Sequence, residues 1–104
     1  MSTRIEQLLA FLEESPADNF LVHALALEYA KAGDFEQAKA CFKKNLELDS
    51  KYIATYYHLG KLYENKGMEQ EAIETYRAGM EVAQVIGDQH AFSELRSVYE
   101  ELTF

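Results

Sequence analysis

Apolar side chains recur along this chain at the spacing of amphipathic helices, separated by short polar breaks. In the first clear example, Leu25 and Tyr29 lie four positions apart and therefore share one helical face. Gly33 can adopt the left-handed backbone that ends many helices, and Asp34 has a side chain suited to capping the helix that follows. The pattern predicts a helix, a tight turn with a positive φ at the glycine, and a second, antiparallel helix.

The same pattern returns 34 residues later in the chain. The repeated positions combine large apolar residues, small residues and a turn glycine: Leu25, Ala26, Tyr29, Gly33, Ala38 and Phe42 in the first copy, and Leu59, Gly60, Tyr63, Gly67, Ala72 and Tyr76 in the second. A fixed period of this length is the sequence signature of a helical repeat array. The small residues Ala26 and Gly60 also predict that a neighbouring helix approaches closely at these positions.

This pattern resembles the tetratricopeptide repeat, whose signature of Trp, Leu, Gly, Tyr, Ala, Phe and a closing Pro extends over 34 residues. Residues 19–52 form one such unit and residues 53–86 form a second. The chain departs from the signature at two slots: Val22 and Tyr56 replace the Trp, and Ser50 and Gln84 replace the Pro. The resemblance implies an all-α fold, a right-handed α-solenoid of antiparallel helix pairs.

The flanking residues complete what we expect to be a single domain over residues 1–104. Residues 3–14 carry a broad apolar stripe, and Pro16 follows in the closing-proline slot, so this helix is predicted to be the second half of a repeat. Residues 87–104 lack the repeat signature but are amphipathic, which predicts a C-terminal capping helix. Its apolar face is expected to consist of Phe92, Leu95, Tyr99 and Leu102. The total is about six helices.

Composition narrows the possible functions. The 104 residues include 18 acidic and 10 basic side chains, for a formal net charge of −8. Nucleic acids and anionic membranes require a positive surface, so neither is an expected partner, whereas a basic protein is. Cys41 is the only cysteine, which excludes an internal disulfide. Because residues 1–4 lead into a Glu-containing amphipathic stretch without the apolar core of a signal peptide, we predict a cytoplasmic location.

No residue pattern predicts catalysis or a bound cofactor. His23, His58 and His90 lie on the first helices of successive units, but packed helices are ~8–10 Å apart and zinc needs its ligands at ~2 Å. Cys41 has two lysines nearby that could activate a thiol, yet a partly buried structural cysteine is the favoured interpretation. Four glutamates might suggest paired carboxylates for acid–base catalysis: Glu69, Glu71, Glu74 and Glu81. We interpret them instead as the solvent-exposed face of a helix. We therefore expect no catalytic, metal or cofactor site.

Protein binding is the remaining hypothesis, because in tetratricopeptide domains the first helix of each pair lines a concave groove. The first-helix positions that the core does not use are expected to contact the partner: Phe20, His23, Leu27, Lys31, Tyr57, Lys61 and Glu64. The basic clamp with which some co-chaperone members of the family hold a peptide carboxylate is absent, because those slots hold His23, Leu27 and His58. We predict a non-catalytic adaptor or scaffold that binds a peptide or helix in this groove. The alternative is a self-association module that forms a homodimer.

Overall fold

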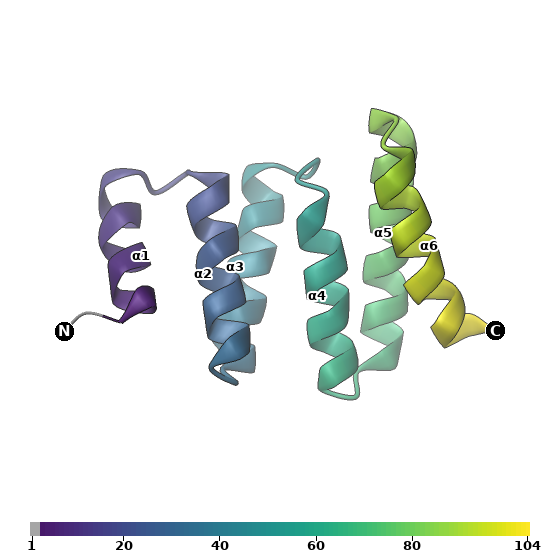
Figure 1. Ribbon diagram of the computed structural model, residues 1–104, viewed down its shortest axis with the longest axis horizontal. Coiled ribbons are helices and arrows are strands. Elements are labelled where there is room, and N and C mark those ends of the chain that lie inside the picture. Colours follow the sequence, from purple (N-terminus) through teal and green to yellow (C-terminus); the bar gives the residue numbers. More distant parts are fainter. Residues whose placement is uncertain (1–2) are drawn as a thin grey trace. The chain divides into compact units, whose positions relative to one another are not determined.

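The computed structural model describes residues 3–104, which contain six α-helices and no strand (Figure 1). Residues 1 and 2 lie outside the described residues. They belong to the predicted domain and to the N-terminal stretch that was compared with a signal peptide. The chain divides into a first unit that ends at Asp49 and a second unit, Ser50–Phe104. The predicted all-α class is therefore confirmed for the described residues, while the single domain over residues 1–104 stays a prediction.

The first unit contains α1 (Arg4–Glu14), α2 (Asn19–Lys31) and α3 (Phe35–Leu48), and α2 packs against both neighbours (Figure 1). The second unit contains α4 (Ala54–Asn65), α5 (Glu69–Ile86) and α6 (Gln89–Thr103), and here α5 packs against both neighbours. Helices α1 and α6 begin and end within about two residues of the predicted ranges 3–14 and 87–104, which is the usual uncertainty at helix ends.

Four of these helices begin at a side-chain cap. Asp18, Asp34 and Asp88 each accept a hydrogen bond from the backbone N–H three residues later, at 3.1, 3.2 and 2.9 Å. Thr3 caps α1 in the same way, and the Thr3 backbone N–H donates a hydrogen bond to the Glu6 carboxylate, which completes a capping box. The cap at Asp34 confirms the prediction made from the sequence.

Gly33 and Gly67 have the predicted positive φ, at 79° and 77°, and Gly87 at the end of α5 also has a positive φ of 76°. A Cβ at any of the three would meet nothing within 4 Å, so backbone conformation alone, and not crowding, requires glycine there. The residue after each glycine donates its N–H at 2.9 Å to a carbonyl five positions earlier, which satisfies a free helix-end carbonyl.

In the first unit, the core lies where α2 meets α1 and α3. Its buried apolar side chains are Leu8, Val22, Leu25, Ala26, Ala38 and Phe42. Asn45 is also fully buried. Its side-chain oxygen accepts a 2.9 Å hydrogen bond from Asn19 Nδ2, which also lies 3.3 Å from the Asn45 carbonyl oxygen. This polar pair joins the start of α2 to the end of α3 and provides a hydrogen-bond partner for a polar side chain in the core.

The second unit packs two glycines against aromatic side chains. A Cβ at Gly60 would lie 2.1 Å from Tyr76 Cε1, so the close helix approach predicted at this slot is confirmed. A Cβ at Gly79 would lie 2.6 Å from Tyr56 Cβ and 3.0 Å from Leu95 Cδ1. Each missing side chain makes room for a large one from another helix.

The buried face of α6 differs in part from the predicted one. Ala91, Leu95 and Val98 are at most 9% exposed, whereas Phe92 and Tyr99 are only half-buried. The spacing of four and three residues places the first three on one stripe, and the small Ala91 lies on it where the helix approaches its neighbours. The sequence correctly predicted an amphipathic helix, but the predicted apolar face included Phe92 and Tyr99 in place of Ala91 and Val98.

Candidate functional site

Three of the predicted contact residues are brought together on α4. The Nζ atom of Lys61 lies 5.8 Å from the centroid of the Tyr57 ring and 3.5 Å from Glu64 Oε2. All three side chains are half-buried. The row therefore combines an aromatic ring, a cation stacked on that ring and a carboxylate paired with the cation.

Glu64 is also held from the protein interior, because the hydroxyl of Tyr76 on α5 donates a hydrogen bond to its carboxylate. Burial, followed by this hydrogen bond, raises the pKa of Tyr76 far above its usual value. The phenol thus stays protonated and remains a donor at any physiological pH. A fully buried core residue consequently orients one member of the α4 row.

A hollow of about 230 Å³ lies beside this row, between the N-terminal parts of α4 and α6. Its lining residues are Ile53, Ala54, Tyr57, Asp88, His90, Ala91, Glu94 and Leu95. Ala91 and Leu95 are buried, so they form an apolar floor, and Glu94 and His90 are exposed with 3.7 Å between Oε1 and Nε2. The hollow is therefore apolar at its base and charged at its rim.

His58 lies next to Tyr57 on α4, with the two rings 5.5 Å apart and nearly perpendicular. Burial lowers the pKa of His58 below its usual 6.5, and the negative charge of Glu94 opposes this shift without cancelling it. The imidazole is consequently neutral at pH 7 and adds no positive charge beside the hollow.

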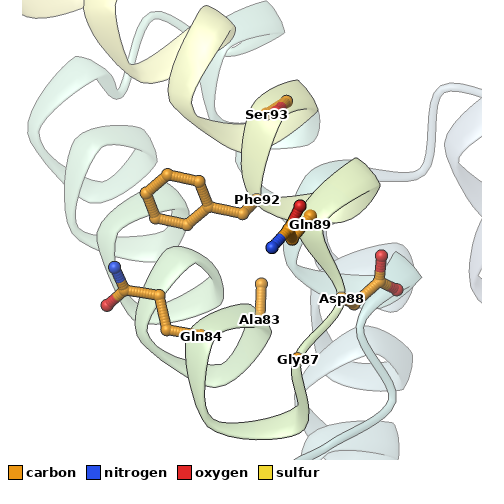
Figure 2. Close-up of a pocket in the computed structure, with 7 residues that line it drawn as sticks. All are labelled: Ala83, Gln84, Gly87, Asp88, Gln89, Phe92 and Ser93. Carbon is orange, nitrogen blue, oxygen red and sulfur yellow. The ribbon is translucent and has the colours of Figure 1, made fainter.

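A second hollow, of about 330 Å³, lies where α5 ends and α6 begins (Figure 2). Figure 2 shows Phe92 projecting from α6 toward the part of α5 that carries Gln84. Of the residues described as lining it, Asp88 alone is ionisable, and this side chain already caps α6. The sequence did not predict this hollow, because it is formed by the α5 end and the α6 start and not by the repeat positions.

The predicted residues of α2 differ widely in exposure. Phe20 is 66% exposed, Leu27 is half-buried, and Lys31 is exposed with its Nζ 3.7 Å from Glu28 Oε2. His23, in contrast, is only 8% exposed, and its ring centroid lies 5.7 Å from that of Phe42. His23 therefore packs in the core, and the expectation that it offers contact surface needs correction.

Three further features of the described residues concern metal binding, the reactivity of Cys41 and membrane insertion. No group of three or more His, Cys, Asp or Glu side chains within residues 3–104 could hold a metal ion. Burial raises the pKa of the Cys41 thiol, and Lys44 offsets this only in part, so the thiol is the opposite of an activated nucleophile. None of the helices in the described part of the chain is long and apolar enough to cross a membrane.

Comparison with known proteins identifies the repeat family. A TPR repeat model matches residues 26–67, and a tetratricopeptide repeat model matches residues 53–85. The solution structure of a tetratricopeptide repeat domain protein from Salinibacter ruber is 42% identical, with a TM-score of 0.79, over 84% of this chain and 88% of that chain. Curated protein sequences gave no match.

Two further structures share the fold. A protein from Bordetella parapertussis is 27% identical with a TM-score of 0.85, over 99% of this chain and 90% of that chain. The TPR2B domain of yeast Sti1, solved in a complex with pHsp70, is 18% identical with a TM-score of 0.87, over 95% and 79% of the two chains. They confirm the predicted class, an all-α helical-repeat solenoid. The chain thus belongs to the tetratricopeptide repeat family, whose repeats mediate protein–protein interaction.

Proposed function

We propose that this protein is a non-catalytic module that binds a peptide or a helix of a partner protein on the face of α4 that carries Tyr57, Lys61 and Glu64, the face expected to line the concave groove. The row Tyr57–Lys61–Glu64 is the observation that carries this proposal. It offers a ring for apolar contact and charged groups for directional hydrogen bonds, a combination that is typical of interface anchors. Because Tyr76 already holds Glu64, a ligand spends little free energy on ordering this side chain.

The equivalent face of α2 is proposed to contact a partner through Phe20, Leu27 and Lys31. Phe20 is 66% exposed, and a large exposed aromatic residue is a frequent contact site. We leave His23 out of the proposed contact surface because its side chain is buried against Phe42.

The expected ligand is a protein segment with basic residues, held at micromolar strength. The yeast Sti1 domain of the same fold was solved with pHsp70, which supports a protein-derived ligand. The net charge of −8 favours a basic segment that associates faster at low salt. A single short helix face supplies on the order of −8 kcal/mol, which corresponds to a dissociation constant of about 1 μM. The lone Cys41 supports a reducing compartment, and we propose the cytoplasm.

A peptide display library screened against the folded protein tests this function. Selected peptides should shift the backbone NMR signals of residues 54–65, and Tyr57→Ala should weaken their binding by about 30-fold, the effect of losing a ~2 kcal/mol anchor. Leu27→Ser tests the α2 face in the same titration. Leu48→Ser is a matched control, because Leu48 is 40% exposed but lies on α3, the second helix of the first repeat, which is not expected to contact the ligand. Folded Tyr57→Ala and Leu27→Ser variants that bind as tightly as the parent would refute the proposal.

Self-association is a second candidate, supported by two exposed apolar side chains on α1. Leu9 is 43% exposed and Phe11 is 53% exposed, and they flank the stripe that α1 buries. If a homodimer forms through this helix, the mass measured by light scattering should double as concentration rises, and Leu9→Ser with Phe11→Ser should prevent this. A monomeric mass at every concentration up to the millimolar range excludes this candidate.

A further inference from the structure

The hollow between α4 and α6 has the chemistry of a receptor for one long basic side chain. We propose that it takes an arginine or lysine side chain of a bound protein segment. This inference rests on the proposed function, because the side chain belongs to the segment that binds the α4 face. It adds a sequence requirement to that function, namely a basic residue at the position that reaches α6.

Size favours a single side chain as the occupant. The volume of about 230 Å³ lies below the ~300–1,000 Å³ of pockets that hold drug-sized ligands. The floor consists of Ala91 and Leu95, at 9% and 1% exposure, and Ile53 and Ala54 form an apolar wall at the start of α4. The methylene stem of arginine or lysine can lie along such a surface while its charged head stays at the opening.

The rim supplies groups that prefer a cation. Glu94 is 58% exposed and can turn toward an incoming guanidinium or ammonium group. Asp88 adds a second carboxylate, although one of its oxygens already accepts the N–H of Ala91 at 2.9 Å. Tyr57 adds an aromatic ring, and such rings attract cations.

The positive groups near the hollow do not cancel this preference at neutral pH. Lys61 is already paired with Glu64 at 3.5 Å. Burial lowers the pKa of His58, which therefore remains uncharged. The side chain of His90 at the rim is 86% exposed, so water and salt screen its interaction with a group bound in the hollow. An acidic side chain would be repelled by the carboxylates of Asp88 and Glu94. A purely apolar side chain would displace water from these carboxylates without offering hydrogen bonds in its place. Arginine and lysine are the side chains that satisfy both the floor and the rim.

An NMR titration with N-acetyl-arginine methylamide tests this inference directly, with the uncharged citrulline analogue as the matched control. The arginine probe should give saturable shifts at Ala54, Ala91 and Glu94, and the citrulline probe should give none. Glu94→Gln should weaken the arginine probe about fivefold, as expected for one partly exposed charged contact. Glu101→Gln, an exposed change on the same helix outside the hollow, should leave binding unchanged.

A second variant tests the shape of the hollow without a change of charge. Ala54 is exposed at the first position of α4, so Ala54→Leu should fold normally while it fills the opening. We expect it to abolish the saturable shifts. Equal shifts from the citrulline probe, or wild-type affinity in Glu94→Gln, would overturn the inference.

Peptides selected for the α4 face separate this inference from the proposed function. If such peptides bind and lose at least fivefold affinity when their basic residue is replaced by citrulline, both stand. If they bind equally well after that replacement, the basic-side-chain pocket is wrong and the binding function stands. If no peptide binds α4, the proposed function fails, and the arginine probe still decides whether the pocket accepts a cation.

Discussion

Gly60 of α4 lies so close to Tyr76 of α5 that a methyl group at residue 60 would be 2.1 Å from Tyr76 Cε1. The Tyr76 side chain is fully buried, so the ring cannot avoid such a methyl group by turning into solvent without losing its place in the core. Its hydroxyl is also fixed by the hydrogen bond to Glu64, one turn beyond Gly60 on the same helix. Helix α4 therefore contacts one edge of the ring through Gly60 and binds the hydroxyl next to that edge through Glu64.

Gly60→Ala should destabilise the protein by about 1–3 kcal/mol, because the added methyl group overpacks the contact with Tyr76. In an open helical position the same change would instead stabilise by roughly 0.5–1 kcal/mol. The sign of the change in the free energy of unfolding, measured with urea, therefore isolates the contact. The double variant Gly60→Ala with Tyr76→Leu is the control, and it should lose less than the sum of the single changes. A Gly60→Ala variant more stable than the parent would contradict this prediction.

Gly67→Val should cost about 2 kcal/mol or more, because a β-branched residue fits poorly at the φ of 77° found there. Gly67→Asn should cost much less, because asparagine tolerates the left-handed conformation. Within residues 3–104, a Cβ added at residue 67 would meet nothing within 4 Å beyond its chain neighbours, so packing cannot explain a difference between the two variants. Melting temperatures measured side by side decide this prediction, and equal values would show that the turn tolerates any residue.

Leu95→Ala should cost about 2–5 kcal/mol, because Leu95 is 1% exposed and contacts the surface left open by Gly79. Ser97→Ala is the exposed control on the same helix and should change stability by less than about 0.5 kcal/mol.

Deletion of residues 87–104 is expected to cause aggregation, or melting near ambient temperature, because it uncovers the α5 surface. A truncated protein that stays monomeric with an unchanged melting temperature would show that α6 does not stabilise the fold.

Asn45→Ala should reduce the free energy of unfolding by about 1–3 kcal/mol. The change removes the side-chain oxygen that accepts the 2.9 Å hydrogen bond from the Asn19 amide, and it leaves this part-buried donor with only the longer 3.3 Å bond to the backbone carbonyl of residue 45. Asn65→Ala on the exposed end of α4 is the control. The double variant Asn19→Ala with Asn45→Ala should recover part of the loss, and a neutral single variant would show that the pair has no role in stability.

Acidification should destabilise the second unit partly through His58. Burial lowers the pKa of His58 in the folded state below the usual 6.5, so the unfolded chain binds the proton more tightly. The loss of stability should begin as the pH falls below about 6.5 and continue down to the folded-state pKa. Urea unfolding at several pH values should show a smaller loss in His58→Gln than in the parent, and His90→Gln serves as the exposed control. The same slope in His58→Gln and the parent would contradict this prediction.

Much of the fold could be predicted because each repeat position has one structural role. The 34-residue period was sufficient to identify the turns at Gly33 and Gly67 and the close contact at Gly60. Asn45 could not be predicted in this way, because its partner Asn19 is distant in sequence and outside the repeat signature. The buried face of α6 was misplaced for a related reason. A small residue such as Ala91 is buried when another helix approaches it, and its own hydrophobicity gives no sign of that approach.

The candidate site was less accessible to sequence analysis than the fold. Spacing placed Tyr57, Lys61 and Glu64 on one helix face, and the structure adds the contacts that join them. Spacing could not distinguish His23, which is buried, from Phe20, which is exposed, because both lie off the main core stripe. The hollow between α4 and α6 was also missed, since its Asp88 and Glu94 come from a helix that lacks the repeat signature.

The contact between Gly60 and Tyr76 has a consequence for anyone who wishes to build new arrays from this chain. Repeats are often treated as interchangeable modules, but the two repeats here use different pairs in these slots, Ala26 with Phe42 and Gly60 with Tyr76. A chimera that joins a first helix carrying alanine to a second helix carrying tyrosine would recreate the overpacked contact of Gly60→Ala. The smallest unit that can be transplanted intact is therefore the helix pair, and not the single helix.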